Sequence, residues 1–114
     1  VVVEKSVVRP TYSSLGRFFI SDAVVAAIAE RASRDVPGVA GCTRVVVESR
    51  EEGVLISMDL VFHYGTRLVP ALHAVRARVR EVVESLTALH VLSLEVVARR
   101  VVQAEGPASV PAEE

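Results

Sequence analysis

The stretch GVLISMDLVFHYGTRLVPALHAVRARVREVVESLTAL, residues 53–89, decides the fold of this chain. In its first part apolar residues recur at every second position over nine residues, which is the period of a β-strand. These positions are Val54, Ile56, Met58, Leu60 and Phe62. After Pro70 the spacing changes to three and four residues, which places the apolar side chains along one side of a helix. The helical positions are Leu72, Val75, Val79, Val82, Val83 and Leu86.

A strand and a helix with one apolar face each bury those faces against one another and against further elements of the same two kinds. The flanking sequence predicts these elements: a short strand over 16–20, a helix over 22–34 with Ser21 as its N-cap, a strand from 39 or 41 to 48, and a strand from 90 to about 102. The polar turn 49–53 predicts an antiparallel hairpin. We therefore predict an α+β two-layer sandwich, with two helices on one face of a mixed sheet and the order β-α-β-β-α-β.

The predicted domain organisation follows from these elements. We expect an N-terminal arm or edge strand over 1–15, an α+β domain over 16–103, and a flexible C-terminal tail over 104–114, where two prolines, small residues and acids dominate.

Composition narrows the class of function. The chain has 114 residues, a net charge of −1 and 4% aromatic residues, so neither charge nor stacking surface favours nucleic acid or anionic lipid. The single cysteine, Cys42, excludes an internal disulfide and a cysteine-based zinc site. No apolar run exceeds about seven residues, so we expect a reduced cytoplasmic protein that does not insert into a membrane.

The candidate chemical sites are weak. Ser57, Asp59 and His63 share one face of the predicted strand, but residues two apart on a strand lie roughly 6.6 Å apart, which is too far for a hydrogen-bonded triad. His63, His73 and His90 lack the spacing of a metal cluster. Cys42 has the setting of a small core residue, and the uncharged GxxG sequence at 38–41 has that of a helix exit rather than an RNA clamp. We predict no catalytic, cofactor-binding or metal-binding residues and no cofactor.

The predicted sheet face that points away from the helices is more informative. By alternation it carries Leu55, Ser57, Asp59, Val61, His63, Val91, Ser93, Glu95, Val97 and Arg99. About half of this face is apolar, which indicates self-association or a docking partner. We take Leu55, Val61, His63, Val91 and Val97 as its candidate interface residues. His73, Arg76 and Arg80 form a second candidate, a basic ridge that could contact an acidic peptide, although an exposed charged helix face is the simpler interpretation.

The order and spacing of three segments carry a family resemblance: GRFFISDAVVAAIAERASRDVPGVAG (16–41), GVLISMDLVFHYG (53–65) and VPALHAVRARVREVVESLTALHVLSLEVV (69–97). They resemble the alkaline shock protein family of bacterial envelope stress response proteins over roughly residues 12–102. Pro70 lies one position later than in the family pattern, and Ala88 replaces the usual glycine before Leu89.

The resemblance implies a cytoplasmic, non-enzymatic homo-oligomer with no catalytic residues to carry over. Some members associate with the membrane through a small separate anchor protein, and some are encoded near a fatty-acid kinase. Our first interpretation is therefore a self-associating scaffold or adaptor at the cytoplasmic side of the envelope. The alternatives are an RNA-binding module with helices on a sheet, and an accessory subunit of a lipid-metabolising kinase.

Overall fold

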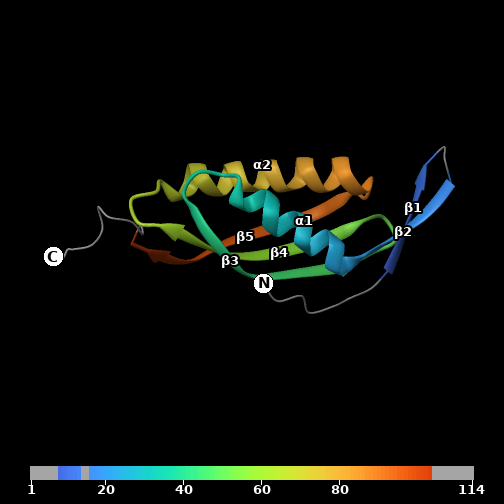
Figure 1. Ribbon diagram of the computed structural model, residues 1–114, viewed down its shortest axis with the longest axis horizontal. Helices are drawn as coiled ribbons and strands as arrows, with labels where there is room; N and C mark the ends of the chain where they lie inside the picture. The colour runs from blue at the N-terminus through green and yellow to red at the C-terminus, as the bar shows by residue number, and fades with distance from the viewer. Residues whose placement is uncertain (1–7, 14–15, 104–114) are drawn as a thin grey trace.

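The computed structural model describes residues 8–13 and 16–103, with side chains from Phe19 onward. Two helices lie on one face of a three-stranded sheet, which confirms the predicted two-layer α+β architecture (Figure 1). The elements are β1 (Val8–Ser13), β2 (Gly16–Ser21), α1 (Asp22–Arg34), β3 (Val39–Ser49), β4 (Val54–His63), α2 (Leu68–Thr87) and β5 (Val91–Val102).

The sheet has the order β3-β4-β5, so β4 is the central strand. β4 is antiparallel to β3 because the turn between them is short: the Arg50 amide donates to the Gly53 carbonyl at 2.7 Å, and the Gly53 amide donates back at 3.3 Å. β5 is parallel to β4, which requires a long crossover. The 20 residues of α2 provide it, since a helix of that length spans about 30 Å. The predicted mixed sheet and the hairpin are both confirmed.

The first strands form a separate two-stranded ribbon. β2, the short strand expected at 16–20, pairs antiparallel with β1 and not with the main sheet. The ribbon stands at the end of the sheet near the β3–β4 turn, and β2 continues directly into α1 (Figure 1). The arm therefore supplies β1 over residues 8–13, while residues 1–7 and the tail at 104–114 lie outside the described residues.

The core lies between β4 and the two helices. All five apolar residues predicted to alternate along β4 are buried, and Val75, Val79 and Val83 of α2 are fully buried against them. α1 contributes the buried Val25, Ala29 and Ala32, and it covers β3 while α2 covers β5.

The last turn of α2 differs from the predicted stripe. Leu86 is 67% exposed, because Thr87 takes the inward position one turn after Val83. The Thr87 hydroxyl donates to the Val83 carbonyl at 2.7 Å and accepts from the Leu89 amide at 3.1 Å. A threonine is therefore buried here with its hydroxyl hydrogen-bonded, and a leucine faces solvent. The helix also begins at Leu68, two residues before Pro70, since its first turn has no intrahelical acceptor for the missing N–H.

A buried carboxylate fixes the start of α1. The Ser21 hydroxyl caps the helix by accepting from the Val24 amide at 3.3 Å, which confirms the predicted N-cap. Asp22 is fully buried, and the Ser49 hydroxyl at the end of β3 contacts its two carboxylate oxygens at 2.8 and 3.1 Å. The negative charge also lies at the positive end of the helix dipole. This contact joins α1 to the far end of β3.

Ala88 ends α2 in the left-handed conformation, with a φ of 63°. This conformation costs an L-residue about 1–2 kcal/mol, and glycine is the residue that usually occupies it. We expect Ala88→Gly to raise the free energy of unfolding by about 0.5–1 kcal/mol in urea titrations, after allowance for the greater entropy of glycine in the unfolded chain. The matched control is Ala77→Gly in the exposed middle of α2, which should lower it by about 1 kcal/mol. An equal loss in both variants would contradict this interpretation.

Gly53 lies against the backbone that enters β5. The Val54 amide donates to the His90 carbonyl at 2.8 Å, and a Cβ added at Gly53 would collide with that same carbonyl oxygen. We expect Gly53→Ala to lower the free energy of unfolding by about 1–3 kcal/mol because two strands must separate. Gly41→Ala is the control, since no atom lies within 4 Å of the Cβ that it would add. Chemical denaturation of both variants measures the difference, and similar stability of the two would refute the steric argument.

Candidate interaction surface

Among the described residues, no helix or strand covers the face of β4 opposite the helices. Leu55, Ser57, Asp59 and His63 are half-buried there, whereas the predicted interface residue Val61 is only 6% exposed and therefore offers almost no contact surface. Each of these residues lies between neighbours on both flanking strands, since β4 is the central strand. The neighbours on β3 are Arg44, Val46 and Glu48, which pair with Asp59, Ser57 and Leu55. We call this side of the sheet the open face.

One predicted interface residue is placed wrongly by simple alternation. Val54 pairs with Val91 but Leu55 pairs with Ser93, so Leu92 is an extra residue at the start of β5. A bulge of this kind reverses the alternation on one strand. Val91 therefore enters the core and is 2% exposed, while Leu92 is 38% exposed. From Ser93 onward the prediction holds again, because Ser93, Glu95 and Val97 pair with Leu55, Ser57 and Asp59.

A second register shift brings two arginines to the open face. Leu60 pairs with Ala98 but Val61 pairs with Arg100, which leaves Arg99 as the additional residue. The Arg99 guanidinium contacts the Asp59 carboxylate at 3.3 Å. Asp59 therefore has an ion-pair partner on β5, and the arrangement of Ser57, Asp59 and His63 is that of an open sheet surface.

The open face is hollowed at one end. A shallow depression of about 320 Å³ is lined by residues of all three strands, among them Val46, Leu55, Ser57, Ser93 and Glu95. Its lining is more apolar than polar and includes two glutamates, Glu48 and Glu95. A depression of this shape favours contact with another surface more than enclosure of a small molecule, since ligand pockets normally bury most of their ligand.

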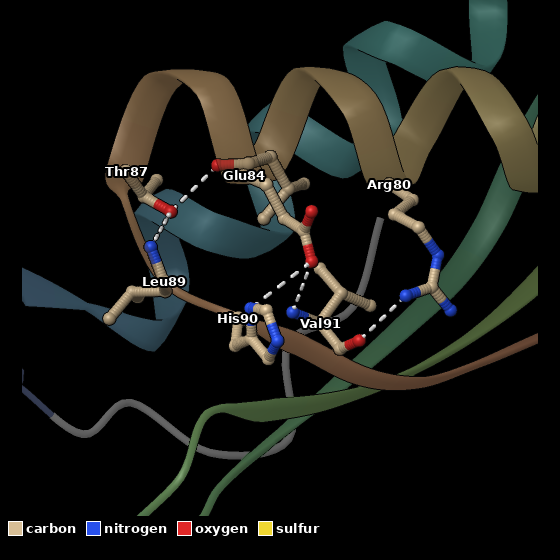
Figure 2. A network of polar contacts seen from close by, with 7 residues as sticks. Arg80, Glu84, Thr87, Leu89, His90 and Val91 are labelled. Carbon is tan, nitrogen blue, oxygen red and sulfur yellow. Dashed lines mark hydrogen bonds and ion pairs between the residues drawn. The ribbon is translucent and has the colours of Figure 1, made fainter.

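The basic ridge predicted on α2 is divided by a contact within the chain. His73 and Arg76 are exposed, but the Arg80 guanidinium donates to the Val91 carbonyl at 2.9 Å. Glu84 accepts from the Val91 amide at 2.9 Å and lies 3.8 Å from His90 Nδ1 (Figure 2). Arg80 and Glu84 thus hold both backbone groups of Val91 and fix the entry of β5 under α2. Arg80 is engaged in this contact with the backbone of Val91, so only His73 and Arg76 remain as the exposed part of the ridge.

A second apolar surface was missed by sequence reasoning. A groove of about 260 Å³ lies between α1 and α2, lined by Ala27, Ile28, Arg31, Ala32, Asp35, Val82 and Leu86. Arg78 of α2 contacts Asp35 at the end of α1 at 3.4 Å. The sequence signal was the presence of Val82 and Leu86 in the apolar stripe of α2, since both line this groove.

The histidines lie apart: His63 at the end of β4, His73 on α2 and His90 just before β5. Within residues 8–13 and 16–103, no three His, Cys, Asp or Glu side chains are grouped in a way that could hold a metal ion. In the GxxG sequence, Gly38 has a φ of 98° and its carbonyl accepts from the His63 amide at 2.8 Å. That loop is therefore tied to the end of β4.

Cys42 lies in the core side of β3, as predicted. Burial raises the pKa of its thiol above the ordinary range, since the interior disfavours the thiolate. The folded state therefore holds the proton more tightly than the unfolded state. The protonated thiol thus contributes to the free energy of unfolding. This contribution is complete at pH values below the pKa of an unfolded cysteine, about 8.5, and it is lost as the pH rises through the pKa of Cys42 in the folded state.

This difference predicts a pH effect on stability. Between pH 7 and pH 9.5 the free energy of unfolding should fall more in the wild type than in Cys42→Ala, because only the wild type must keep a buried thiol protonated. Urea titrations of both proteins at the two pH values measure the effect, and other titrating groups cancel in the comparison. Equal pH dependence in the two proteins would show that the thiol does not contribute.

Solved structures share the fold. A doubly substituted MamM CTD matches with a TM-score of 0.58 and 17% identity over 74% of this chain and 97% of that chain. A singly substituted MamM-CTD matches with a TM-score of 0.53 and 20% identity, over 69% and 96% of the two chains, and a copper form of another variant gives the same values. At these identities the likeness concerns the fold alone. No curated protein matches the chain.

No helix in the described ranges has the length and apolar content needed to cross a membrane. The family comparison is more specific. The model of the alkaline shock protein 23 family, which is described as having a cell envelope-related function, matches residues 43–103. This range covers more than half of the chain, from β3 through the helical crossover to the end of β5. The chain therefore belongs to the alkaline shock protein family.

Proposed function

We propose that this protein is a non-enzymatic, self-associating scaffold or adaptor related to the cell envelope, and that the open face is its contact surface. The observation that carries the proposal is the one-sided cover of the sheet. Both helices lie on one side (Figure 1). The other side presents Val46, Leu55 and Val97 among charged residues. Covering such side chains contributes about 25 cal/mol for each Å² of apolar surface removed from water.

The chemistry of the described residues supports a role in binding rather than in catalysis. Asp59 is engaged by Arg99, Glu84 accepts from the backbone of β5, and Asp22 is held by Ser49. These carboxylates each serve a structural contact. The matching family is described as having a cell envelope-related function, which supports a role connected with the cell envelope.

The finer parts of the proposal follow the family resemblance. The protein would act at the cytoplasmic side of the envelope, and a small membrane-anchor protein would link it to the membrane. His73 and Arg76, the exposed part of the ridge on α2, remain a candidate contact for an acidic partner segment. Co-purification from native membranes, followed by mass spectrometry, tests whether a short membrane-spanning protein accompanies the chain.

Self-association through the open face can be tested by substitution. Val97 is 36% exposed and lies beside Asp59, so Val97→Glu adds a charge to the face without disturbing the core. We expect the wild type to form oligomers at micromolar concentrations and Val97→Glu to shift toward the monomer by about 10-fold in dissociation constant, as measured by light scattering. Leu86→Glu, an exposed position on the helix side, is the matched control and should leave the oligomer intact.

The same measurement can overturn the proposal. A wild type that is monomeric at several hundred micromolar would refute self-association. An oligomer that is lost with Leu86→Glu and kept with Val97→Glu would place the contact on the helix layer instead.

A further inference from the structure

The charges of the open face are separated along the strands. One end carries Glu48 and Glu95, and the β3–β4 turn at that end adds Glu51 and Glu52. The other end carries Arg44, Arg99 and Arg100. Each end has one residue of opposite sign: Arg50, which contacts Glu48 at 3.2 Å, and Asp59, which contacts Arg99 at 3.3 Å. Four glutamates against one arginine and three arginines against one aspartate leave an acidic end and a basic end.

The two ends are far enough apart to act separately. Glu95 pairs with Ser57 and Arg100 pairs with Val61, four residues further along β4, which corresponds to roughly 13 Å along the strands. This separation exceeds the Debye length of about 8 Å at physiological ionic strength. Val46 and Ser57 lie level with Glu95, and Val97 lies level with Asp59, so uncharged residues share the middle of the face with charged ones.

We propose that a second copy of this chain covers the open face in a two-fold arrangement in which the strands of the two copies run antiparallel. This inference rests on the proposed self-association and specifies its geometry. Two sheets that pack face to face with nearly aligned strands can be related by a two-fold axis across the strands or along them. Only the axis across the strands places the acidic end of each copy over the basic end of the other. The axis along the strands stacks acid on acid and base on base, which disfavours association.

The size of the face sets the expected affinity. Three strands about 4.8 Å apart and ten residues long make a surface of roughly 15 by 33 Å. That area is below the roughly 800 Å² per partner of a standard stable interface. We therefore expect a dissociation constant in the micromolar range, at which electrostatic complementarity has a measurable influence.

Charge reversal of the full-length chain tests the orientation. Glu95→Lys reduces the net charge of the acidic end from −3 to −1, Arg100→Glu reduces that of the basic end from +2 to 0, and both positions are exposed. Each single variant should raise the dissociation constant about 10-fold, because the attraction between the ends is weakened at both symmetric contacts. An equimolar mixture of the two variants should associate more tightly than either variant alone, because the intact basic end of one meets the intact acidic end of the other, whereas the double variant Glu95→Lys/Arg100→Glu should stay weak. Sedimentation velocity measures all five samples, and circular dichroism checks that each remains folded.

The outcomes separate this geometry from self-association itself. If the wild type associates, the single variants weaken it and the mixture recovers, the antiparallel arrangement is supported. If the wild type associates but a single variant tightens the complex, or the mixture fails to recover, the arrangement is overturned while self-association stands. A monomeric wild type overturns both. In 1 M salt, where the Debye length is about 3 Å, the single variants should approach the wild type.

Discussion

The structure depends on the burial of one strand. β4 has its five inward side chains in the core, and both its edges are hydrogen-bonded, to β3 on one side and to β5 on the other. Each inward side chain contributes about 1.5–3 kcal/mol when it leaves water. Within the described residues, only the two helices shield the inward side chains of β4 from water. α2 is also the crossover connection that makes β5 parallel to β4. Sheet order, helix placement and the identity of the open face all follow from this one constraint.

Specific polar contacts then fix how the layers meet. Asp22 and Ser49 join the start of α1 to the end of β3, and Arg80 and Glu84 hold the first residue of β5 beneath α2 (Figure 2). Each contact joins an element terminus to a neighbouring layer, where the loss of a hydrogen-bonding partner would leave a buried polar group unsatisfied. These contacts explain why several charged residues that looked available on the sequence serve the fold instead.

A sheet covered on one side leaves the other side as the natural place for recognition. A three-stranded sheet is narrow, and a narrow face that mixes apolar residues with an acidic and a basic end has the properties of a weak, oriented contact. The membership of the alkaline shock protein family and its cell envelope-related function agree with a role in assembly. The groove between α1 and α2 offers a separate surface, so that one layer can contact a further copy while the other remains accessible.

The sequence by itself determined the elements, their order and the core of β4, because strand and helix periods are local properties of the chain. It also identified Ser21 as a cap, which follows from the hydrogen-bonding preference of a single residue, while Ala88 stood out only as a departure from the family pattern. The tertiary structure alone decided which residues occupy the two faces of β5. The bulge at Leu92 sends Val91 inward, and the shift at Arg99 adds a second arginine to the open face. It also decided that Thr87 and not Leu86 packs inward, and that Arg80 turns to the backbone of Val91. The separation of acidic and basic ends depends on how three strands are aligned, and alignment is set by bulges and turns that bring distant residues together, which no local period encodes.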